Sequence, residues 1–269
     1  MEITAVNNPH VKNAAELKQK KYRTKSGLFL AEGLRTVEEA IEANQVESVF
    51  YTPVDDERTR KALELAAAHN IKLFCVSEAV MKKISDTETP QGIIAVCNMT
   101  HLNLEELLSQ GKMLLVLDRV QDPGNIGTML RTADASGIGG LLLLNGCADI
   151  YAPKTVRASM GSLFHLPVLQ GLDDEAFINL AKDYGYELLV TCLEGADNLY
   201  KADLSGRIAF VMGNEANGVS DKFLQAADKK VFIPMQGKAE SLNVAMAAGV
   251  VMFEALRRRL TENKKVRKR

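Results

Sequence analysis

Apolar and polar positions along residues 1–105 alternate between two patterns. Four short runs, "LFLAEG", "VESVFYT", "IKLFCV" and "GIIAVCN", are rich in β-branched and aromatic residues and predict strands. Between them, residues 34–44 and 57–70 carry apolar side chains at helical spacing. The segment "NMTHLNLEELLSQGK" then has the polar composition of a connector. We therefore predict a small α/β domain over residues 1–105.

The pattern changes over residues 106–269, where the strands become almost wholly apolar. The run "MLLVLD" is typical of a strand buried on both faces, and "GLLLLN", "YELLVTCLE", "RIAFVMGNE" and "KKVFIPM" follow it. Helices are expected near 126–137 and 153–162. Strands that alternate with helices predict a parallel sheet, and ligands usually bind such sheets in loops at the carboxyl ends of strands.

The first loop of interest is "DRVQDPGNIGTMLRTADASG". Its turn sequence precedes a helix that we expect to begin near Ile126, with Asn125 as the N-cap. Arg131 lies six residues after Asn125, near the start of this helix. A cap and an exposed helical arginine are the plain structural interpretation of these two residues.

Two further loops follow strands. In "MGNEANGVS", Gly213 and Gly218 bracket a lone acid, Glu215, and glycines there permit positive φ or close approach of a ligand. In "IPMQGKAESLN", Ser241 and Asn243 stand where a helix begins with unpaired backbone N–H groups, which could hold a polar small molecule. A plain turn and a capped core helix are the alternatives.

Composition narrows the class of protein. Hydrophobic residues make up 46% of the 269 residues, which excludes wholesale disorder. No apolar run is long enough to span a membrane, the N-terminus has no signal-peptide core, and the four widely spaced cysteines form no disulfide framework. We therefore expect a soluble, cytoplasmic protein with free thiols.

The charge is small overall and uneven along the chain. The formal net charge is −1, yet residues 12–25 carry six Lys or Arg against one Glu, and residues 257–269 carry eight against one. Two basic segments on an acidic body favour contact with a polyanion such as RNA. A solvated helix end and a frayed tail are the alternative interpretation.

Several common catalytic motifs are absent from the sequence. There is no GxGxxG after the first strand of the second domain, no GxxxxGK[ST], no HExxH and no GxSxG. The four histidines are isolated, so we expect no metal site. A dinucleotide-dependent dehydrogenase, suggested only by the α/β pattern, is disfavoured because its glycine fingerprint is missing.

Together and in this order, the three loops resemble the SpoU/TrmH family of ribose methyltransferases, a branch of the SPOUT superfamily. The matching stretches are "LDRVQDPGNIGTMLRTADASG", "VMGNEANGVS" and "IPMQGKAESLNVAMAAG". Val219 stands where the family more often has Leu. Residues 1–100, particularly "SGLFLAEGLRTVEEAI", are similar to the substrate-binding domain with an L30e-like fold that often precedes this catalytic domain.

The resemblance implies transfer of a methyl group from S-adenosyl-L-methionine to a ribose 2′-hydroxyl of RNA, in a homodimer whose catalytic domain contains a deep trefoil knot. It implies a methyl-donor site at Leu193, Gly213, Ile233, Met235, Ser241 and Leu242. It implies catalytic roles for Asn125, Arg131, Glu215 and Asn243. For RNA binding we expect the basic residues Lys18, Lys20, Lys21, Arg23 and Arg35.

The chemistry of these residue types agrees with that activity. The sulfonium of the donor already activates the methyl group, so the protein must position the hydroxyl and favour its deprotonation. Family proposals make Arg131 a general base, but a permanently charged guanidinium is better suited to stabilise the developing alkoxide or to grip a phosphate. Asn125 and Glu215 would then orient Arg131 and the ribose.

The sequence indicates the reaction more clearly than it indicates the RNA substrate. Large-subunit rRNA is the expected target, and tRNA is the alternative. An RNA-binding or ribosome-assembly protein without catalysis, and a SPOUT enzyme that methylates a base, are two further alternatives.

Overall fold

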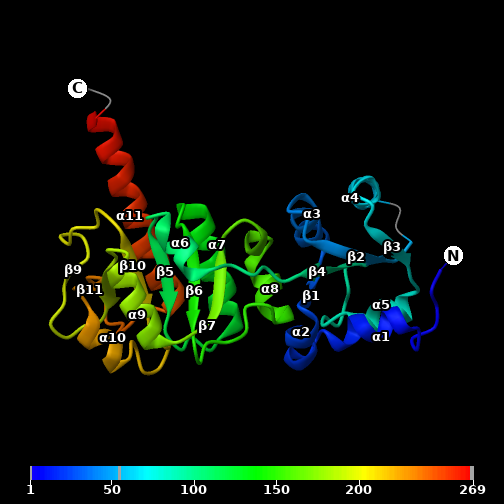
Figure 1. Cartoon of the computed structure of the whole chain (residues 1–269), viewed down its shortest axis with the longest axis horizontal. Coiled ribbons are helices and arrows are strands. Elements are labelled where there is room, and N and C mark those ends of the chain that lie inside the picture. Colours follow the sequence, from blue (N-terminus) through cyan, green and yellow to red (C-terminus); the bar gives the residue numbers. More distant parts are fainter. Residues whose placement is uncertain (1, 54–55, 267–269) are drawn as a thin grey trace. The chain divides into compact units, whose positions relative to one another are not determined.

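The computed structural model describes residues 2–53 and 56–266, with side chains described as far as Thr261 (Figure 1). The chain forms two compact units. Unit 1 comprises the residues through Thr100 together with Asp149–His165, and unit 2 comprises His101–Ala148 together with the residues from Leu166 onward. Of the basic segment 257–269, the residues from 262 onward lie outside the described side chains.

Unit 1 contains a four-stranded sheet in the order β1-β4-β2-β3. Strand β4 is antiparallel to both of its neighbours, whereas β2 and β3 are parallel. The strands are β1 (Leu28–Glu32), β2 (Val46–Tyr51), β3 (Lys72–Cys75) and β4 (Ile93–Asn98). The helices along this part of the chain are α1 (Pro9–Glu16), α2 (Lys20–Ser26), α3 (Leu34–Glu42), α4 (Glu57–Ala68) and α5 (Glu78–Ile84).

The core of unit 1 lies between its sheet and two of its helices. Side chains from α1 and α5 cover one face of the sheet, where Leu30, Phe50 and Ile94 are at most 4% exposed. The face is covered incompletely, because Leu28 and Phe74, which pack at the border of this cluster, are only partly buried.

A segment from the second half of the chain completes unit 1. Residues 149–165 contain α8 (Pro153–Ser159) and the short 3-10 helix η1 (Ser162–Phe164). The Phe29 ring lies 4.8 Å from the Tyr151 ring and 6.0 Å from the Phe164 ring, measured between centroids. Asp149 pairs at 2.7 Å with Arg23, whose side chain is only 4% exposed. The predicted boundary after residue 105 puts this segment in the second domain, whereas its aromatic residues are buried against β1.

Unit 2 is built on a seven-stranded sheet in the order β7-β6-β5-β10-β8-β11-β9. Every neighbouring pair in it is parallel, as the sequence predicts. The strands are β5 (Leu114–Leu117), β6 (Gly140–Leu144), β7 (Val168–Leu172), β8 (Glu187–Thr191), β9 (Asp197–Asn198), β10 (Ile208–Met212) and β11 (Lys229–Phe232). The helices are α6 (Leu104–Ser109), α7 (Pro123–Ser136), α9 (Asp174–Asp183), α10 (Asp221–Ala226) and α11 (Val244–Val266).

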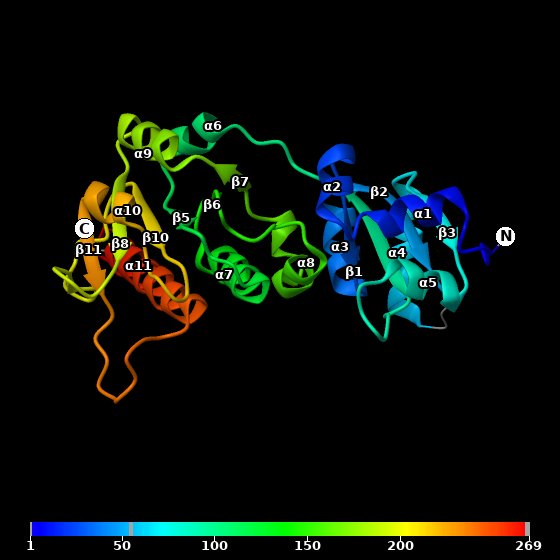
Figure 2. The same cartoon turned by 90° about the horizontal axis from the view of Figure 1, so that it is seen from below.

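Both faces of this sheet are covered, which explains its continuous apolar runs. Leu114 and Val116 on β5 point to one face, where they join a core with α6, α9 and α10. Leu115 and Leu117 alternate with them and are also fully buried. Helix α7 packs against α11 in unit 2 (Figure 2).

Glu254 binds Arg258, and Arg258 connects α11 to the loop after β9. Its carboxylate accepts hydrogen bonds from Arg257 at 2.7 and 2.8 Å and from Arg258 at 2.7 Å. Arg258 also donates to the carbonyl oxygens of Leu199 and Ala202. The bonds from Arg257, and then those from Arg258, outweigh the opposing effect of burial and lower the pKa of Glu254 to about 2.

We expect Glu254→Gln to lower the free energy of unfolding at pH 7 by about 2 kcal/mol. Because the folded-state pKa lies below the ordinary value of 4.5, the contribution is complete above that value and is lost as the pH falls toward about 2. Urea unfolding of both proteins between pH 7 and pH 3 measures this difference. A Glu57→Gln control removes an exposed ion pair, with side chains 75% and 71% exposed, and should change stability by less than about 0.5 kcal/mol. A difference that stays constant with pH contradicts the assignment.

Candidate active site

The three motif loops meet at one edge of the sheet of unit 2. Strands β5, β10 and β11 are all parallel within it, so their carboxyl ends reach the same edge. Each motif loop begins where one of these strands ends. The expected position of a ligand site in a parallel sheet is this edge.

The side chain of Asn125 joins the other two motifs. Its Nδ2 donates a hydrogen bond to Oε1 of Glu215 at 3.0 Å, and its Oδ1 accepts one from Nδ2 of Asn243 at 3.0 Å. Asn243 also caps α11, because its Oδ1 accepts from the backbone N–H of Ala245 at 2.9 Å. One chain of hydrogen bonds therefore connects the first, second and third motifs.

Glu215 holds the first motif loop as an ionised carboxylate. Besides Asn125, it accepts hydrogen bonds from the backbone N–H groups of Gln121 at 3.3 Å and Asp122 at 3.2 Å. Partial burial acts to raise its pKa, but the hydrogen bonds from Asn125 and from the backbone outweigh that effect, and the net pKa is lowered. Both carboxylate oxygens are thus engaged by the protein itself.

Helix α7 begins earlier than the sequence analysis predicts. Its N-cap is Asp122, whose Oδ1 accepts from the backbone N–H of Asn125 at 2.9 Å, and Pro123 occupies the first helical position. The prediction of Asn125 as N-cap, with a helix start near Ile126, is therefore wrong. Since Asp122 performs the capping, the amide of Asn125 is available for Glu215 and Asn243.

Gly213 lies where the main chain of the second motif loop returns close to itself, at Gly218 and Val219. A Cβ atom there would lie 2.2 Å from the backbone carbon of Gly218 and 2.2 Å from the backbone nitrogen of Val219. The loop beyond it is fastened by two backbone bonds of 2.9 Å between Asn214 and Gly218, and Gly218 has φ +67°. Only glycine fits position 213, because any side chain would collide with main-chain atoms.

Asp118 is a site residue that the sequence analysis missed. It ends β5 with no exposed surface, and its Oδ2 accepts from the backbone N–H of Ser220 at 2.7 Å. It thus connects the base of the first motif loop to the end of the second. The available signal was a carboxylate at the end of a wholly apolar strand, where a buried charge needs a structural reason.

Beside the hydrogen-bonded chain lies a cavity of about 640 Å³. It contains all six residues expected for the methyl donor, namely Leu193, Gly213, Ile233, Met235, Ser241 and Leu242. Asn243 and Glu215 also line it, so the cavity adjoins the network of motif residues. Leu193 is 74% exposed and Leu242 is 41% exposed, which leaves two apolar side chains open to solvent at the site.

Comparison with known proteins identifies the family. The SpoU rRNA Methylase family matches residues 112–253, which span the whole sheet edge with its three loops. The chain belongs to this SpoU family. The MRM3-like substrate binding domain matches residues 8–95, in unit 1.

Relatives of this SpoU protein are similar to it over nearly its whole length. It is 36% identical to "23S rRNA (guanosine(2553)-2'-O)-methyltransferase RlmP" of Bacillus subtilis, covering 94% of this chain and 98% of that protein. It is 31% identical to "23S rRNA (uridine(2479)-2'-O)-methyltransferase" of Streptomyces viridochromogenes, covering 96% and 93%. A solved structure, "AdoMet bound rRNA methyltransferase from Sinorhizobium meliloti", aligns with a TM-score of 0.87 and 32% identity over 96% of this chain and 98% of that one.

Arg131 stands apart from the network of this SpoU protein. It lies exposed on α7, and within the part of the chain that the structure describes its side chain makes no hydrogen bond or ion pair. The expectation that Asn125 and Glu215 orient Arg131 is not met, because those two residues bond to each other and to Asn243. The Arg131 guanidinium is therefore free to contact a ligand.

The basic residues expected to bind RNA divide into two groups. Arg23 is 3% exposed, and besides Asp149 it donates to the carbonyl oxygens of Leu17 and Lys18, both at 2.8 Å. Its assignment as an RNA contact is wrong, because its buried guanidinium is already bound by Asp149 and by backbone carbonyl oxygens inside unit 1. The Nζ of Lys18 donates to the carbonyl oxygens of Lys83 and Ser85, so it too is engaged.

The remaining three basic residues, Lys20, Lys21 and Arg35, are exposed. Lys21 lies with its Nζ 4.6 Å from the ring centroid of Tyr22.

Among the described residues no group of His, Cys, Asp and Glu side chains has the arrangement of a metal site. No helix in the described ranges is long and apolar enough to cross a membrane.

Proposed function

We propose that this protein transfers a methyl group from S-adenosyl-L-methionine to a ribose 2′-hydroxyl of 23S rRNA. The observation that carries the proposal is the cavity at the sheet edge, where six expected donor residues lie beside the Asn125–Glu215–Asn243 chain. The names of the relatives support the same reaction and the same class of substrate.

The cavity fits the methyl donor in size and in chemistry. At about 640 Å³ it lies within the range of small-molecule sites, which are mostly apolar with a few placed polar groups. Ile233, Met235 and Leu242 supply apolar contacts, and the main chain at Gly213 can approach a ligand closely. The bound donor supplies an electrophilic methyl group on a sulfonium, and no metal is needed for that chemistry.

The acceptor side needs a positioned hydroxyl and a positive charge. Arg131 is exposed and unpaired among the described residues, and its permanent charge suits stabilisation of the developing alkoxide or capture of the adjacent phosphate. Glu215 acts as a positioning residue, since both of its oxygens hold the first motif loop. Asn125 and Asn243 join the three motif loops by hydrogen bonds beside the donor cavity.

The two domains divide the work in this proposal. Unit 1 binds the RNA substrate, with Lys20, Lys21 and Arg35 as contacts to phosphate, and unit 2 carries the methyltransferase. We propose a cytoplasmic location, because the two relatives described above are bacterial 23S rRNA methyltransferases. The deep trefoil knot stays a prediction.

Methylation of unmodified rRNA tests the proposed function. The purified protein is incubated with labelled S-adenosyl-L-methionine and with rRNA or tRNA from a strain that lacks the gene. Nuclease digestion and mass spectrometry then show which nucleotide carries the label, since the two relatives above are named for different nucleotides. Label on a ribose of 23S rRNA supports the proposal, whereas label on tRNA, label on a base or no label contradicts it.

We also propose that the protein is a homodimer formed through α11. Met246, Phe253 and Leu260 recur every seven residues along this helix and are 62%, 48% and 55% exposed. Such a stripe of large apolar side chains on one helix face is typical of a helix that packs against another chain.

We expect Phe253→Glu to convert the dimer to a monomer, because each subunit would place a carboxylate in the apolar contact. Sedimentation at micromolar concentration should then show about 29.5 kDa in place of twice that mass. Leu65→Glu, at a 37% exposed position on α4, is the matched control and should remain dimeric. A wild-type protein that sediments as a monomer rules the dimer out.

A further inference from the structure

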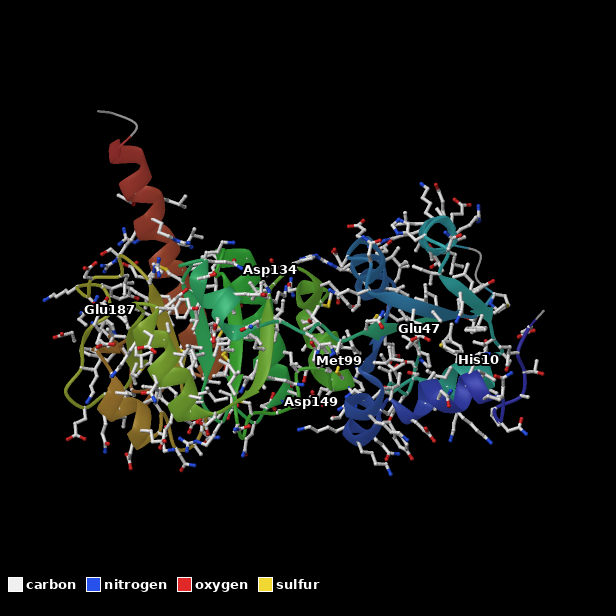
Figure 3. All side chains as sticks on the ribbon, in the orientation of Figure 1. His10, Glu47, Met99, Asp134, Asp149 and Glu187 are labelled. Carbon is white, nitrogen blue, oxygen red and sulfur yellow. The ribbon has the colours of Figure 1, made fainter. Side chains whose placement is uncertain are left out.

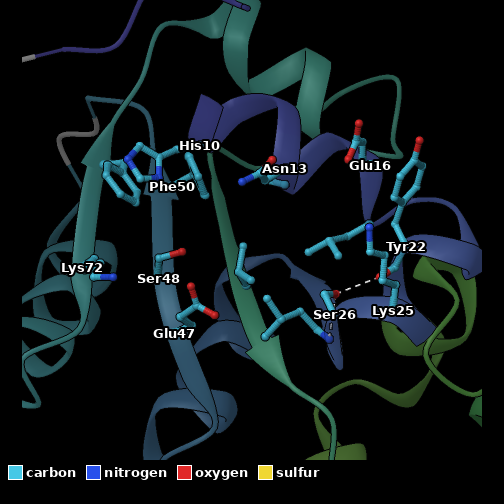
Figure 4. A pocket seen from close by; sticks show the side chains of 15 residues that line it. His10, Asn13, Glu16, Tyr22, Lys25, Ser26, Glu47, Ser48, Phe50 and Lys72 are labelled. Atoms are coloured by element: carbon cyan, nitrogen blue, oxygen red, sulfur yellow. Dashed lines mark hydrogen bonds between the residues drawn. The ribbon is translucent and has the colours of Figure 1, made fainter. Parts of the chain in front are cut away.

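Unit 1 contains a second cavity that is separate from the motif loops. It has a volume of about 520 Å³ and lies beside the incompletely covered face of the four-stranded sheet (Figure 4). Its apolar floor includes Leu28, Phe50 and Val96, and helices α1 and α2 form its walls. None of the reaction steps proposed above uses this cavity.

An irregularity in β2 aims an extra side chain into this cavity. In the pairing of β2 with β4, Val46 lies opposite Cys97 but Ser48 lies opposite Val96, so Glu47 is the additional residue of a β-bulge. Successive side chains of a regular strand point to opposite faces, yet Glu47 and Ser48 both line the cavity. Bulges commonly redirect a side chain next to a binding site.

The rim of the cavity carries four charged side chains. Glu16 and Glu47 contribute carboxylates, and Lys25 and Lys72 contribute ammonium groups. All four are exposed, and none makes an ion pair within the described part of the chain. With equal numbers of each sign, the rim has no excess positive charge to hold a bare phosphate. It suits a ligand with both hydrogen-bond donors and negative charge.

Aromatic rings complete the cavity. The rings of His10 and Phe74 stack with centroids 4.8 Å apart, and those of Phe74 and Phe50 stack at 5.0 Å. Tyr22 is half-buried on the wall formed by α2. Figure 3 labels His10 on α1 and Glu47 on β2 within unit 1. Planar groups of this kind are the usual surfaces on which unpaired bases stack.

We propose that this cavity binds a single unpaired guanine of the RNA substrate. The Watson–Crick edge of guanine offers two adjacent donors, N1–H and the 2-amino group, to the two oxygens of Glu47. Adenine, cytosine and uracil each offer only one donor group there. Ser48 supplies a further hydroxyl, and the exposed ring of His10 and the half-buried ring of Tyr22 contact the base. Lys25 and Lys72 contact the flanking phosphates. This proposal rests on the RNA methylation proposed above and adds a sequence-reading site remote from the methyl donor.

Nucleotide titration of the full-length protein tests the base preference. Guanosine 5′-monophosphate should shift NMR signals of residues that line this cavity. Inosine 5′-monophosphate, which lacks the 2-amino group, should bind more weakly, and adenosine 5′-monophosphate more weakly still. Equal shifts from all three nucleotides, or no shift within the cavity, would overturn the proposal.

The variant Glu47→Gln removes the paired acceptor without disturbing the core, because Glu47 is exposed. We expect guanosine 5′-monophosphate to bind at least about tenfold more weakly to it, and the KM for 23S rRNA to rise while kcat stays unchanged. The control Glu42→Gln makes the same charge change at an exposed position on α3 and should alter neither quantity. Unchanged nucleotide binding in Glu47→Gln contradicts the site. If the wild type methylates rRNA but ignores guanosine 5′-monophosphate, only this inference fails; absence of methyl transfer defeats the proposed function instead.

Discussion

Arg131→Ala is expected to lower kcat for methyl transfer about a thousandfold, while the Kd for S-adenosyl-L-methionine changes less than about twofold. Arg131 does not line the donor cavity, so its loss leaves the donor contacts intact. It is also exposed and unpaired within the described residues, so no folding interaction goes with it. The whole effect should therefore appear in the chemical step, where a positive charge next to the acceptor hydroxyl is lost.

A charge-preserving variant separates the two roles open to Arg131. Arg131→Lys keeps the positive charge but loses the planar fork, so activity between that of the wild type and that of Arg131→Ala is expected. Lys201→Ala, which removes an exposed cation outside the motif loops, should methylate at the wild-type rate. Single-turnover kinetics with saturating S-adenosyl-L-methionine measure the rate of methyl transfer directly. Normal methylation by Arg131→Ala would show that the acceptor side works without this residue.

Most of the strands could be predicted from the sequence because burial imposes a visible pattern on them, whereas β7 and the two-residue β9 were missed. In unit 2 both faces of the sheet are covered, so "LLVL" and "IAFVM" are continuously apolar and stand out. Short helices leave a weaker pattern. Helix α9 was missed although Asp173 caps it, and α1 was missed although Asn8 and Pro9 form a start signal, because eight or ten residues contain few apolar repeats.

Contacts between distant parts of the chain explain the remaining errors. Arg23 stands among exposed lysines in the sequence, and its burial depends on Asp149, 126 residues away. The capping role given to Asn125 was a reasonable local inference, but Asp122 caps the helix and Asn125 turns to Glu215, 90 residues away. The residue types of the site could be predicted from the motifs, whereas the partners of each residue required the fold.

Two motif glycines that look alike in the sequence should respond very differently to alanine. Gly213→Ala is expected to weaken binding of S-adenosyl-L-methionine and to slow methyl transfer about a hundredfold, because misplacement of reacting groups by about 1 Å lowers a rate by about this factor. The new Cβ would lie 2.2 Å from main-chain atoms of Gly218 and Val219, so the loop must open. Opening it moves Glu215, which positions Asn125 and the first motif loop. Methyl transfer should fall with donor binding.

Gly237→Ala is the matched control within the third motif. A Cβ at Gly237 meets nothing within 4 Å, and its φ is not in the left-handed region. Donor affinity should therefore stay within about twofold of the wild type. Calorimetric titration measures both affinities, and circular dichroism during thermal unfolding verifies that each variant is folded. If a folded Gly213→Ala binds the donor as tightly as Gly237→Ala does, the close approach of main chains at Gly213 has no part in forming the donor site. If both variants lose binding equally, the requirement lies in the motif loops as a whole and not in the contact at Gly213.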